Sequence, residues 1–210
     1  ACKYCYYLEK NNLYQNSHRH LMTDEMLEQF TREYIEAQTM PQVLFTWHGG
    51  EPLMRSIDFY KKALALQKKY AHGKQIDNVI QTNGTLLTDE WCEFFAKNHW
   101  LVGISIDGPQ EYHDHYRVTP AGKPSWEKVM QGISLLKKHR VEWNAMAVVN
   151  AYNAEHPLEF YHFFRDNGCQ YLQFTPIVER LTEHEDGRTL ASLADDREIP
   201  LADASVTPQQ

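Results

Sequence analysis

Short apolar segments alternate with amphipathic segments along most of this chain, and this alternation restricts the fold more than any other feature. The apolar segments are rich in β-branched and aromatic residues, and we expect strands at 43–47, 76–82, 101–107, 143–150 and 171–179. The amphipathic segments predict helices at 24–40, 59–70, 89–98, 126–139 and 155–167. Short apolar strands joined by helices are typical of a parallel sheet with crossover helices, either open or closed into a barrel. Both arrangements bind ligands at the carboxyl ends of their strands.

Glycine-containing turns follow the expected strands directly. Gly49-Gly50-Glu51-Pro52 comes after the first strand, Asn83-Gly84 after the second and Asp107-Gly108-Pro109 after the third. Two consecutive glycines let a ligand approach the backbone, and free carbonyls together with Glu51 can accept hydrogen bonds from an ammonium group. A tight turn with a solvated Glu51 explains the same residues equally well. Asp107 either caps its loop or lines a pocket.

The first residues contain a Cys-x-x-Cys pair, Cys2 and Cys5. Thiolates at this spacing suit zinc or an iron–sulfur cluster, and they also suit a dithiol redox couple. Two ligands do not complete a metal site, so the others have to come from elsewhere. Because the chain begins one residue before Cys2 and without an initiator Met, we expect a ligand upstream. Cys92 and Cys169 are expected to be small core residues.

Composition argues against several classes of function. A net charge of −7 disfavours nucleic acids and membrane surfaces as partners, because both prefer a basic face. No apolar run is long enough to span a bilayer. Four cysteines without regular spacing indicate a reducing compartment, so we expect a cytoplasmic protein. Two histidines in a polar loop, His113 and His115, lack a third metal ligand and are expected to be solvated.

Both ends of the chain are expected to be truncated. From residue 182 onward the sequence is acidic and polar without periodicity, which is typical of a linker or a disordered insert. Residues 205–210 are typical of the first turn of a helix. We therefore expect one core domain over 1–181, followed over 182–210 by a linker and the start of a further C-terminal region.

Six longer strings carry a family resemblance: CKYCYYLEK, TWHGGEP, QTNGTLLTDEW, GISIDGP, HDHYRVTPAGKPSW and FTPIVER. Over residues 1–181 the chain resembles the radical S-adenosylmethionine (SAM) superfamily, and within it the anaerobic sulfatase-maturating enzymes. The cluster motif of that family is Cys-x-x-x-Cys-x-aromatic-Cys. Cys2-Lys3-Tyr4-Cys5 matches its last four positions, and its first cysteine would lie three residues before Ala1. The cysteine-rich SPASM domain of that family, with two auxiliary clusters, has no counterpart in this chain.

The resemblance implies a partial (β/α)6 barrel and a set of cofactor ligands. Cys2 and Cys5, with the upstream cysteine, would hold a [4Fe–4S] cluster whose fourth iron is open. The residues expected to bind SAM lie on the cysteine segment and after several strands: Tyr4, Tyr7, Gly49, Gly50, Glu51, Ser105, Arg117 and Val178. The glycine carbonyls and Glu51 would take the amino group of SAM, and Arg117 its carboxylate. Ser105 would reach the ribose or the carboxylate, and Val178 or its neighbour Ile177 would lie against adenine.

The resemblance also implies a reaction. SAM would be cleaved to methionine and a 5′-deoxyadenosyl radical, which would oxidise a Cys or Ser of a sulfatase peptide to Cα-formylglycine. A flavodoxin or ferredoxin-type protein would supply the electron, and the proton acceptor of the family would lie beyond Gln210. Two alternatives stay open: another SPASM-type peptide-modifying enzyme, or a non-catalytic zinc-binding α/β scaffold. A thioredoxin-like oxidoreductase is disfavoured, because a polar loop rather than a helix follows the cysteines.

Overall fold

The computed structural model of this chain describes residues 2–5, 7, 21–178, 181–183, 189–191, 202–207 and 209. The chain folds as two compact units. The GGEP unit, named after its Gly-Gly-Glu-Pro turn, consists of Tyr14–Ile104 and Met130–Trp143. The cysteine unit, named after Cys2 and Cys5, consists of Ala1–Leu13, Ser105–Val129 and Asn144–Gln210.

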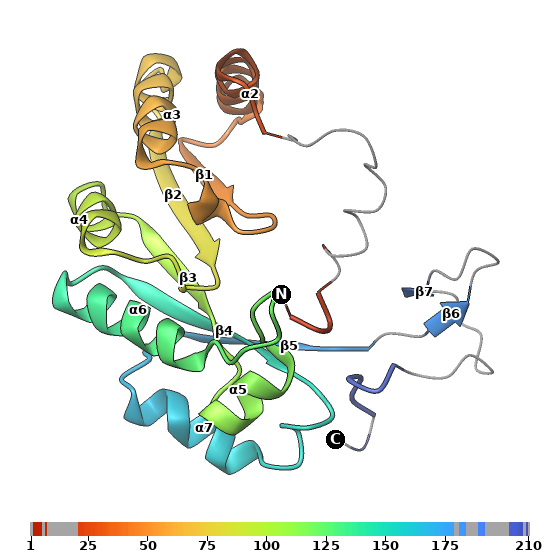
Figure 1. The fold of residues 1–210 in the computed structure, drawn as a ribbon. Helices are drawn as coiled ribbons and strands as arrows, with labels where there is room; N and C mark the ends of the chain where they lie inside the picture. The colour runs from red at the N-terminus through yellow and green to blue at the C-terminus, as the bar shows by residue number, and fades with distance from the viewer. Residues whose placement is uncertain are drawn as a thin grey trace. The chain divides into compact units, whose positions relative to one another are not determined.

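A parallel sheet forms the centre of the GGEP unit (Figure 1). Strand β1 (Gln42–Trp47) pairs with β2 (Gln75–Thr82), and β2 pairs with β3 (Leu101–Ser105). Both pairs are parallel, as the alternating pattern predicts. The carboxyl ends of β1 and β2 therefore lie at one edge of the sheet, where the GGEP turn and Asn83 follow them.

Helices pack on this sheet, and its α-helices lie close to the predicted ranges, whereas the short 3₁₀ helix was not predicted. They are α2 (Asp24–Ala37), the short 3₁₀ helix η2 (Pro52–Met54), α3 (Ile57–Tyr70) and α4 (Asp89–Lys97). The Thr23 hydroxyl accepts a hydrogen bond from the Met26 amide at 3.2 Å, and the Thr88 hydroxyl accepts one from the Trp91 amide at 3.3 Å. Each threonine thus satisfies an amide that the first helical turn leaves unpaired.

An aromatic core fills the GGEP unit. Its members come from two strand ends and two helices: Trp47, Phe59, Tyr60, Trp91, Phe94, Phe95 and Trp100. The rings of Tyr60 and Trp100 meet edge to face with centroids 5.5 Å apart, an arrangement that aromatic pairs prefer. Cys92 is fully buried beside this core, and burial raises the pKa of its thiol to about 11. The expectation that Cys92 is a core residue is confirmed. The same expectation for Cys169 is wrong, because Cys169 is partly exposed.

The cysteine unit is built on two further parallel strands, β4 (Trp143–Val149) and β5 (Leu172–Pro176). Helix α7 (Pro157–Asp166) connects them and buries Phe160 and Phe164. Helix α6 (Trp126–Lys138) begins in this unit and continues in the GGEP unit. The alternation of parallel strands and helices in both units confirms the expected α/β class.

One expectation about the loop after β3 is wrong. The polar segment 110–124 contains helix α5 (Gln110–Tyr116) instead of being wholly irregular. Its buried side chains are Tyr112 and His113, which are 5% and 1% exposed. Because these two side chains can be solvated as readily as buried, hydrophobic periodicity does not reveal this helix.

Two features at the end of the chain, within the described residues, were not predicted from its composition. Part of the expected linker forms an antiparallel strand pair, β6 (Leu181–Glu183) with β7 (Thr189–Ala191), while 184–188 and 192–201 lie outside the described residues. Residues 202–207 contain no helix; the Val206 amide donates to the Ile177 carbonyl at 2.9 Å instead. Over the described part of the chain, no helix has the length and apolar character needed to cross a membrane.

Candidate cluster and SAM site

The segment that carries the cysteine pair is held against the end of helix α5. Cys2 forms an antiparallel bridge with Arg117, and the Lys3 amide donates to the Tyr116 carbonyl at 2.9 Å. The Cys5 amide donates to the Cys2 carbonyl at 3.0 Å, which closes a tight turn. Cys2 and Cys5 are both partly exposed and are not joined by a disulfide. The turn therefore presents two thiols from one short loop.

Asp107 is the buried acceptor behind this loop. Its side chain is fully buried, and Oδ1 accepts a hydrogen bond from the Val148 amide at 2.8 Å. Oδ2 accepts a hydrogen bond from the Tyr4 hydroxyl and lies 2.8 Å from Arg117 Nε. The contact with Nε is an ion pair rather than an aligned hydrogen bond. Asp107 was expected either to cap its loop or to line a pocket; in the structure its buried carboxylate joins three separate segments instead.

The Arg117 guanidinium lies between Asp107 and the cysteine loop. Nη1 lies 3.7 Å from Cys2 Sγ, and Cζ lies 5.6 Å from the centre of the Tyr4 ring. Burial favours the neutral form of Arg117, but the negative charge of Asp107 outweighs it, so the pKa of Arg117 is raised. Burial, followed by Asp107, raises the pKa of Tyr4 and keeps its phenol neutral. Cys2 therefore has a permanent cation beside its sulfur.

His113 is buried and hydrogen-bonded, so the expectation of a solvated loop histidine is wrong. Nδ1 accepts from the Asp107 amide at 3.3 Å, which leaves the ring proton on Nε2. Nε2 lies 3.0 Å from Ser125 Oγ, and the Ser125 hydroxyl donates to the Arg117 carbonyl at 2.7 Å. The chain of contacts supports the backbone on both sides of the buried ion pair. No sequence signal connects His113 with Ser125, because only the fold of the intervening loop brings them together.

The stability of the protein should fall as the pH falls through the titration range of His113. Burial and then the Arg117 charge lower the pKa of His113 from 6.5 to about 4, so below about pH 6.5 only the unfolded chain readily takes up the proton. Stability from this group is complete above about pH 6.5 and is lost toward pH 4, with a loss of about 2 kcal/mol between about pH 7.5 and about pH 5. Urea unfolding at both pH values measures this loss.

The matched variant for this test is His113→Gln, which should remove most of the pH dependence. His162→Gln serves as the control, because His162 is exposed on α7 and should leave the dependence unchanged. An unchanged pH dependence in His113→Gln would contradict the assignment to His113.

In the GGEP unit, the glycines adopt backbone conformations that other residues rarely tolerate. Gly49 has φ 102° and Gly50 has φ 52°. A Cβ placed on Gly50 would have no atom within 4 Å, so the space beside this residue is open. A backbone without side chains next to open space suits close approach by a ligand. This is the geometry that the sequence predicts for the GGEP turn.

The Glu51 carboxylate accepts hydrogen bonds from other groups of the chain. Oε1 accepts from the Leu53 amide at 3.0 Å and from the Thr82 hydroxyl at 2.6 Å, and Oε2 accepts from the Asn83 amide at 2.9 Å. Glu51 thus fixes the GGEP turn to the end of β2.

Replacing Glu51 with alanine should lower the free energy of unfolding by about 3 kcal/mol. Three donors would lose a charged acceptor, and each hydrogen bond to a charged group contributes about 1.5 to 3 kcal/mol without strict additivity. Urea unfolding measures the change. Glu93→Gln, on the exposed surface of α4, is the control and should change stability by less than about 0.5 kcal/mol. Equal stability of Glu51→Ala and wild type would show that the hydrogen bonds of Glu51 do not stabilise the fold.

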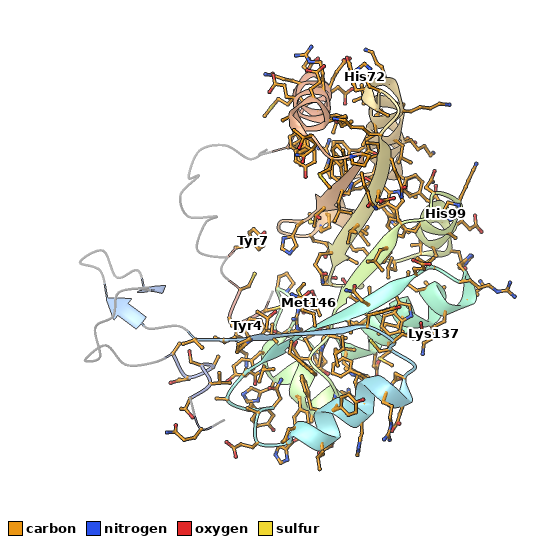
Figure 2. All side chains as sticks on the ribbon, turned by 180° about the vertical axis from the view of Figure 1, so that it is seen from behind. Tyr4, Tyr7, His72, His99, Lys137 and Met146 are labelled. Atoms are coloured by element: carbon orange, nitrogen blue, oxygen red, sulfur yellow. The ribbon has the colours of Figure 1, made fainter. Side chains whose placement is uncertain are left out.

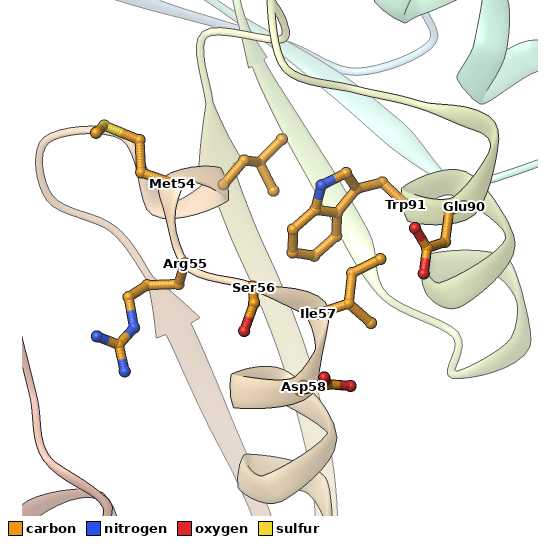
Figure 3. A pocket seen from close by; sticks show the side chains of 8 residues that line it. Met54, Arg55, Ser56, Ile57, Asp58, Glu90 and Trp91 are labelled. Carbon is orange, nitrogen blue, oxygen red and sulfur yellow. The ribbon is translucent and has the colours of Figure 1, made fainter.

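A hollow of about 410 Å³ lies beside the GGEP turn in the same unit. Figure 3 shows its two walls, one formed by the chain from η2 into α3 and the other by α4. Arg55 is engaged there, with Nη2 donating to the Met22 carbonyl at 3.2 Å and Cζ 4.2 Å from the Phe59 ring centre. None of the residues expected to bind SAM lines this hollow.

The remaining expected ligands occupy varied positions in the cysteine unit. Figure 2 shows Tyr4 and Tyr7 on the N-terminal segment, where both are partly buried. Ser105 is partly buried at the end of β3. Val178 is 62% exposed and is available to a ligand, whereas its neighbour Ile177 is 8% exposed. The structure thus gathers Cys2, Tyr4 and Arg117 into one cluster, and Gly49, Gly50 and Glu51 belong to the other unit.

The residues of the cysteine loop fit an iron–sulfur cluster. Two thiols on one turn supply soft ligands, and Arg117 supplies an N–H donor and positive charge beside one sulfur. Over the described residues, no group of three or more His, Cys, Asp and Glu side chains is placed to hold a metal ion. Within that part of the chain, Cys2 and Cys5 alone do not complete a metal site.

Comparisons with known proteins agree with the sequence resemblance. The model of the radical SAM superfamily matches residues 1–164. The chain is 70% identical over 210 residues to a serine-type anaerobic sulfatase-maturating enzyme of Bacteroides thetaiotaomicron, covering 100% of this chain and 51% of that protein. It is 32% identical over 185 residues to a cysteine-type enzyme of Clostridium perfringens, covering 88% and 50%. The chain thus spans about half the length of the curated relatives it matches.

The fold agrees as well. A solved structure described as native anSMEcpe with bound AdoMet and the Cp18Cys peptide matches with a TM-score of 0.77 and 32% identity, over 88% of this chain and 49% of that one. Streptococcus suis SuiB, at 18% identity and a TM-score of 0.60, shares the fold alone. The expected radical SAM type of parallel strands and helices is confirmed. Because the family model matches well over half of the residues of this chain, the chain belongs to the radical SAM superfamily.

Proposed function

We propose that the protein containing this chain is an anaerobic sulfatase maturase that oxidises a side chain of a sulfatase peptide to Cα-formylglycine. The observation that carries the proposal is the 70% identity to a serine-type maturase over the whole chain. Identity to the cysteine-type enzymes is 32–35%, so serine is the favoured target. Residues 1–181 would act as the core domain of this enzyme in a reducing cytoplasm.

Different residues of the chain would bind the cluster and SAM. Cys2 and Cys5 would ligate a [4Fe–4S] cluster, which together with SAM supplies the 5′-deoxyadenosyl radical that removes hydrogen from the substrate. Arg117 would face the SAM carboxylate. The carbonyls of Gly49 and Gly50, together with Glu51, would accept from its amino group.

The remaining residues would contact the adenine and the ribose of SAM. Tyr4, Tyr7 and Val178 would pack against adenine and the cluster, and Ser105 would bond the ribose or the carboxylate. The exposure of Val178 and the neutral phenol of Tyr4 support these roles. A flavodoxin or ferredoxin-type donor would supply the electron, and any auxiliary clusters would be held outside this chain.

The test uses the complete gene product, reconstituted anaerobically with iron and sulfide. It is incubated with SAM, reductant and either a Ser-x-Pro-x-Arg peptide or its cysteine counterpart. We expect 5′-deoxyadenosine together with a serine peptide that has lost two hydrogens, detected by mass spectrometry. SAM cleavage with both peptides unchanged would exclude a maturase and favour another peptide-modifying enzyme. Bound zinc without SAM cleavage would favour the scaffold alternative.

A further inference from the structure

The Asp107 carboxylate connects three segments that are distant in sequence. Its partners come from the cysteine loop (Tyr4), the end of helix α5 (Arg117) and strand β4 (Val148). The carboxylate is 0% exposed, so these protein groups are its partners in place of solvent. A buried charge is tolerated only where it is paired and hydrogen-bonded, and this arrangement meets both conditions.

Asp107 decides which way the Arg117 guanidinium faces. Nε lies 2.8 Å from Asp107 Oδ2, and because the guanidinium is planar and rigid, Nη1 is then directed to Cys2 Sγ at 3.7 Å. The Arg117 backbone is fixed from the other side, through the Cys2–Arg117 bridge and the Ser125 hydroxyl on its carbonyl. The side chain has little freedom to choose another orientation while Asp107 remains.

The Tyr4 hydroxyl links the same carboxylate to the cysteine loop by a hydrogen bond. Tyr4 stands between Cys2 and Cys5, and its hydroxyl donates to Asp107 Oδ2. Its ring lies beside the guanidinium, with Cζ 5.6 Å from the ring centre. The Asp107 carboxylate thus sets the position of the loop and of the cation that faces it.

We propose that Asp107 is a positioning residue for the cluster: it holds Arg117 and Tyr4 so that an N–H donor and a positive charge face the Cys2 sulfur. The proposal rests on the part of the proposed function in which Cys2 ligates the cluster. Hydrogen bonds and charge near a cluster sulfur set its reduction potential, because positive charge stabilises the reduced form. Asp107 would therefore help to set the reduction potential of the cluster without touching either cofactor.

The test compares Asp107→Asn with wild type in the reconstituted complete protein. Asparagine keeps the shape and one acceptor for the Val148 amide, but it removes the charge that orients Arg117. We expect normal iron content, a cluster midpoint potential that is shifted from the wild-type value in an EPR-monitored titration, and SAM binding weakened about tenfold or more. Asp107→Glu should recover part of the wild-type potential and part of the SAM affinity. Asp166→Asn, which removes an exposed partner of Arg165, is the control and should change neither.

A double-mutant cycle separates positioning from a general structural role. If Asp107 acts through Arg117, then Asp107→Asn combined with Arg117→Gln should be no worse than Arg117→Gln alone. Additive effects, or an unchanged potential and unchanged SAM affinity in a folded, iron-loaded Asp107→Asn protein, would overturn the proposal. If Asp107→Asn does not fold, Arg117→Lys is measured in its place, because lysine keeps the positive charge but lacks the planar guanidinium. An unchanged potential in Arg117→Lys would also overturn the proposal.

The potential and the SAM affinity do not depend on the peptide substrate. A shifted potential with no peptide modified would therefore refute the maturase and support the role of Asp107. A wild-type protein that assembles no iron–sulfur cluster would refute the role of Asp107, because Cys2 would then not be a cluster ligand.

Discussion

Replacing Cys5 with alanine in the complete protein is expected to lower both bound iron and SAM cleavage by more than about a hundredfold. Loss of a residue that merely supports a metal ligand costs about 10- to 100-fold, so loss of the ligand itself should cost more. Cys5 closes the turn with Cys2 through its amide, and alanine keeps that amide, so the loop should still form. Iron content, the visible absorption of the cluster and release of 5′-deoxyadenosine are the measurements.

Cys169→Ala is the matched control for this variant. Cys169 is also partly exposed in the cysteine unit, but it lies just before β5, where its thiol donates to the Tyr171 carbonyl at 3.1 Å. We expect its iron content and SAM cleavage to stay within about twofold of wild type, because no cluster role is assigned to it. Wild-type iron in Cys5→Ala would remove Cys5 from the ligand set. Loss of zinc instead of iron would point to a structural site.

Replacing Gly108 with alanine should destabilise the protein by about 3 kcal/mol, which for a chain of this length lowers Tm by about 6 to 12 °C. Two effects add. Gly108 has φ +85°, a conformation that costs an L-residue about 1 to 2 kcal/mol. An alanine Cβ would also lie 2.6 Å from Cδ2 of Phe160, whose ring is buried against Phe164 and Phe174 and cannot easily move away.

The two effects can be separated with Gly122→Ala in the same unit. Gly122 has φ +71°, but a Cβ there would meet nothing within 4 Å. This variant should therefore show only the conformational cost, about 1 kcal/mol. Calorimetry or thermal unfolding of both proteins gives the difference. If the two variants were equally stable, the close packing of Phe160 on Gly108 would not exist.

The sequence was sufficient for the elements that depend on local periodicity. The five expected parallel strands and the helices between them were found. Each of these elements repeats one pattern over several residues and buries one face, so neighbouring residues carry the information. Helix α5 lacked that pattern, because its buried positions are a tyrosine and a histidine.

The sequence also indicated the cofactor class, because CKYCYYLEK and the later strings resemble one family, and the matched family model agrees. It did not reveal what the acidic residues do. It did not show that the Glu51 carboxylate also binds Thr82 and Asn83, which lie 31 and 32 residues away. Asp107 was left between two readings, and its contacts lie 41 residues away at Val148 and 103 away at Tyr4.

The amino-acid sequence by itself therefore determined the order of strands and helices, the glycine turns after the strands and the family. Only the tertiary structure decided that Asp107, Arg117 and Tyr4 form one buried cluster behind Cys2, and that His113 and Ser125 support it. The physical reason is the range of the interactions. Periodicity and turn geometry act between neighbours, whereas a buried carboxylate must be satisfied by whichever donors the fold brings to it.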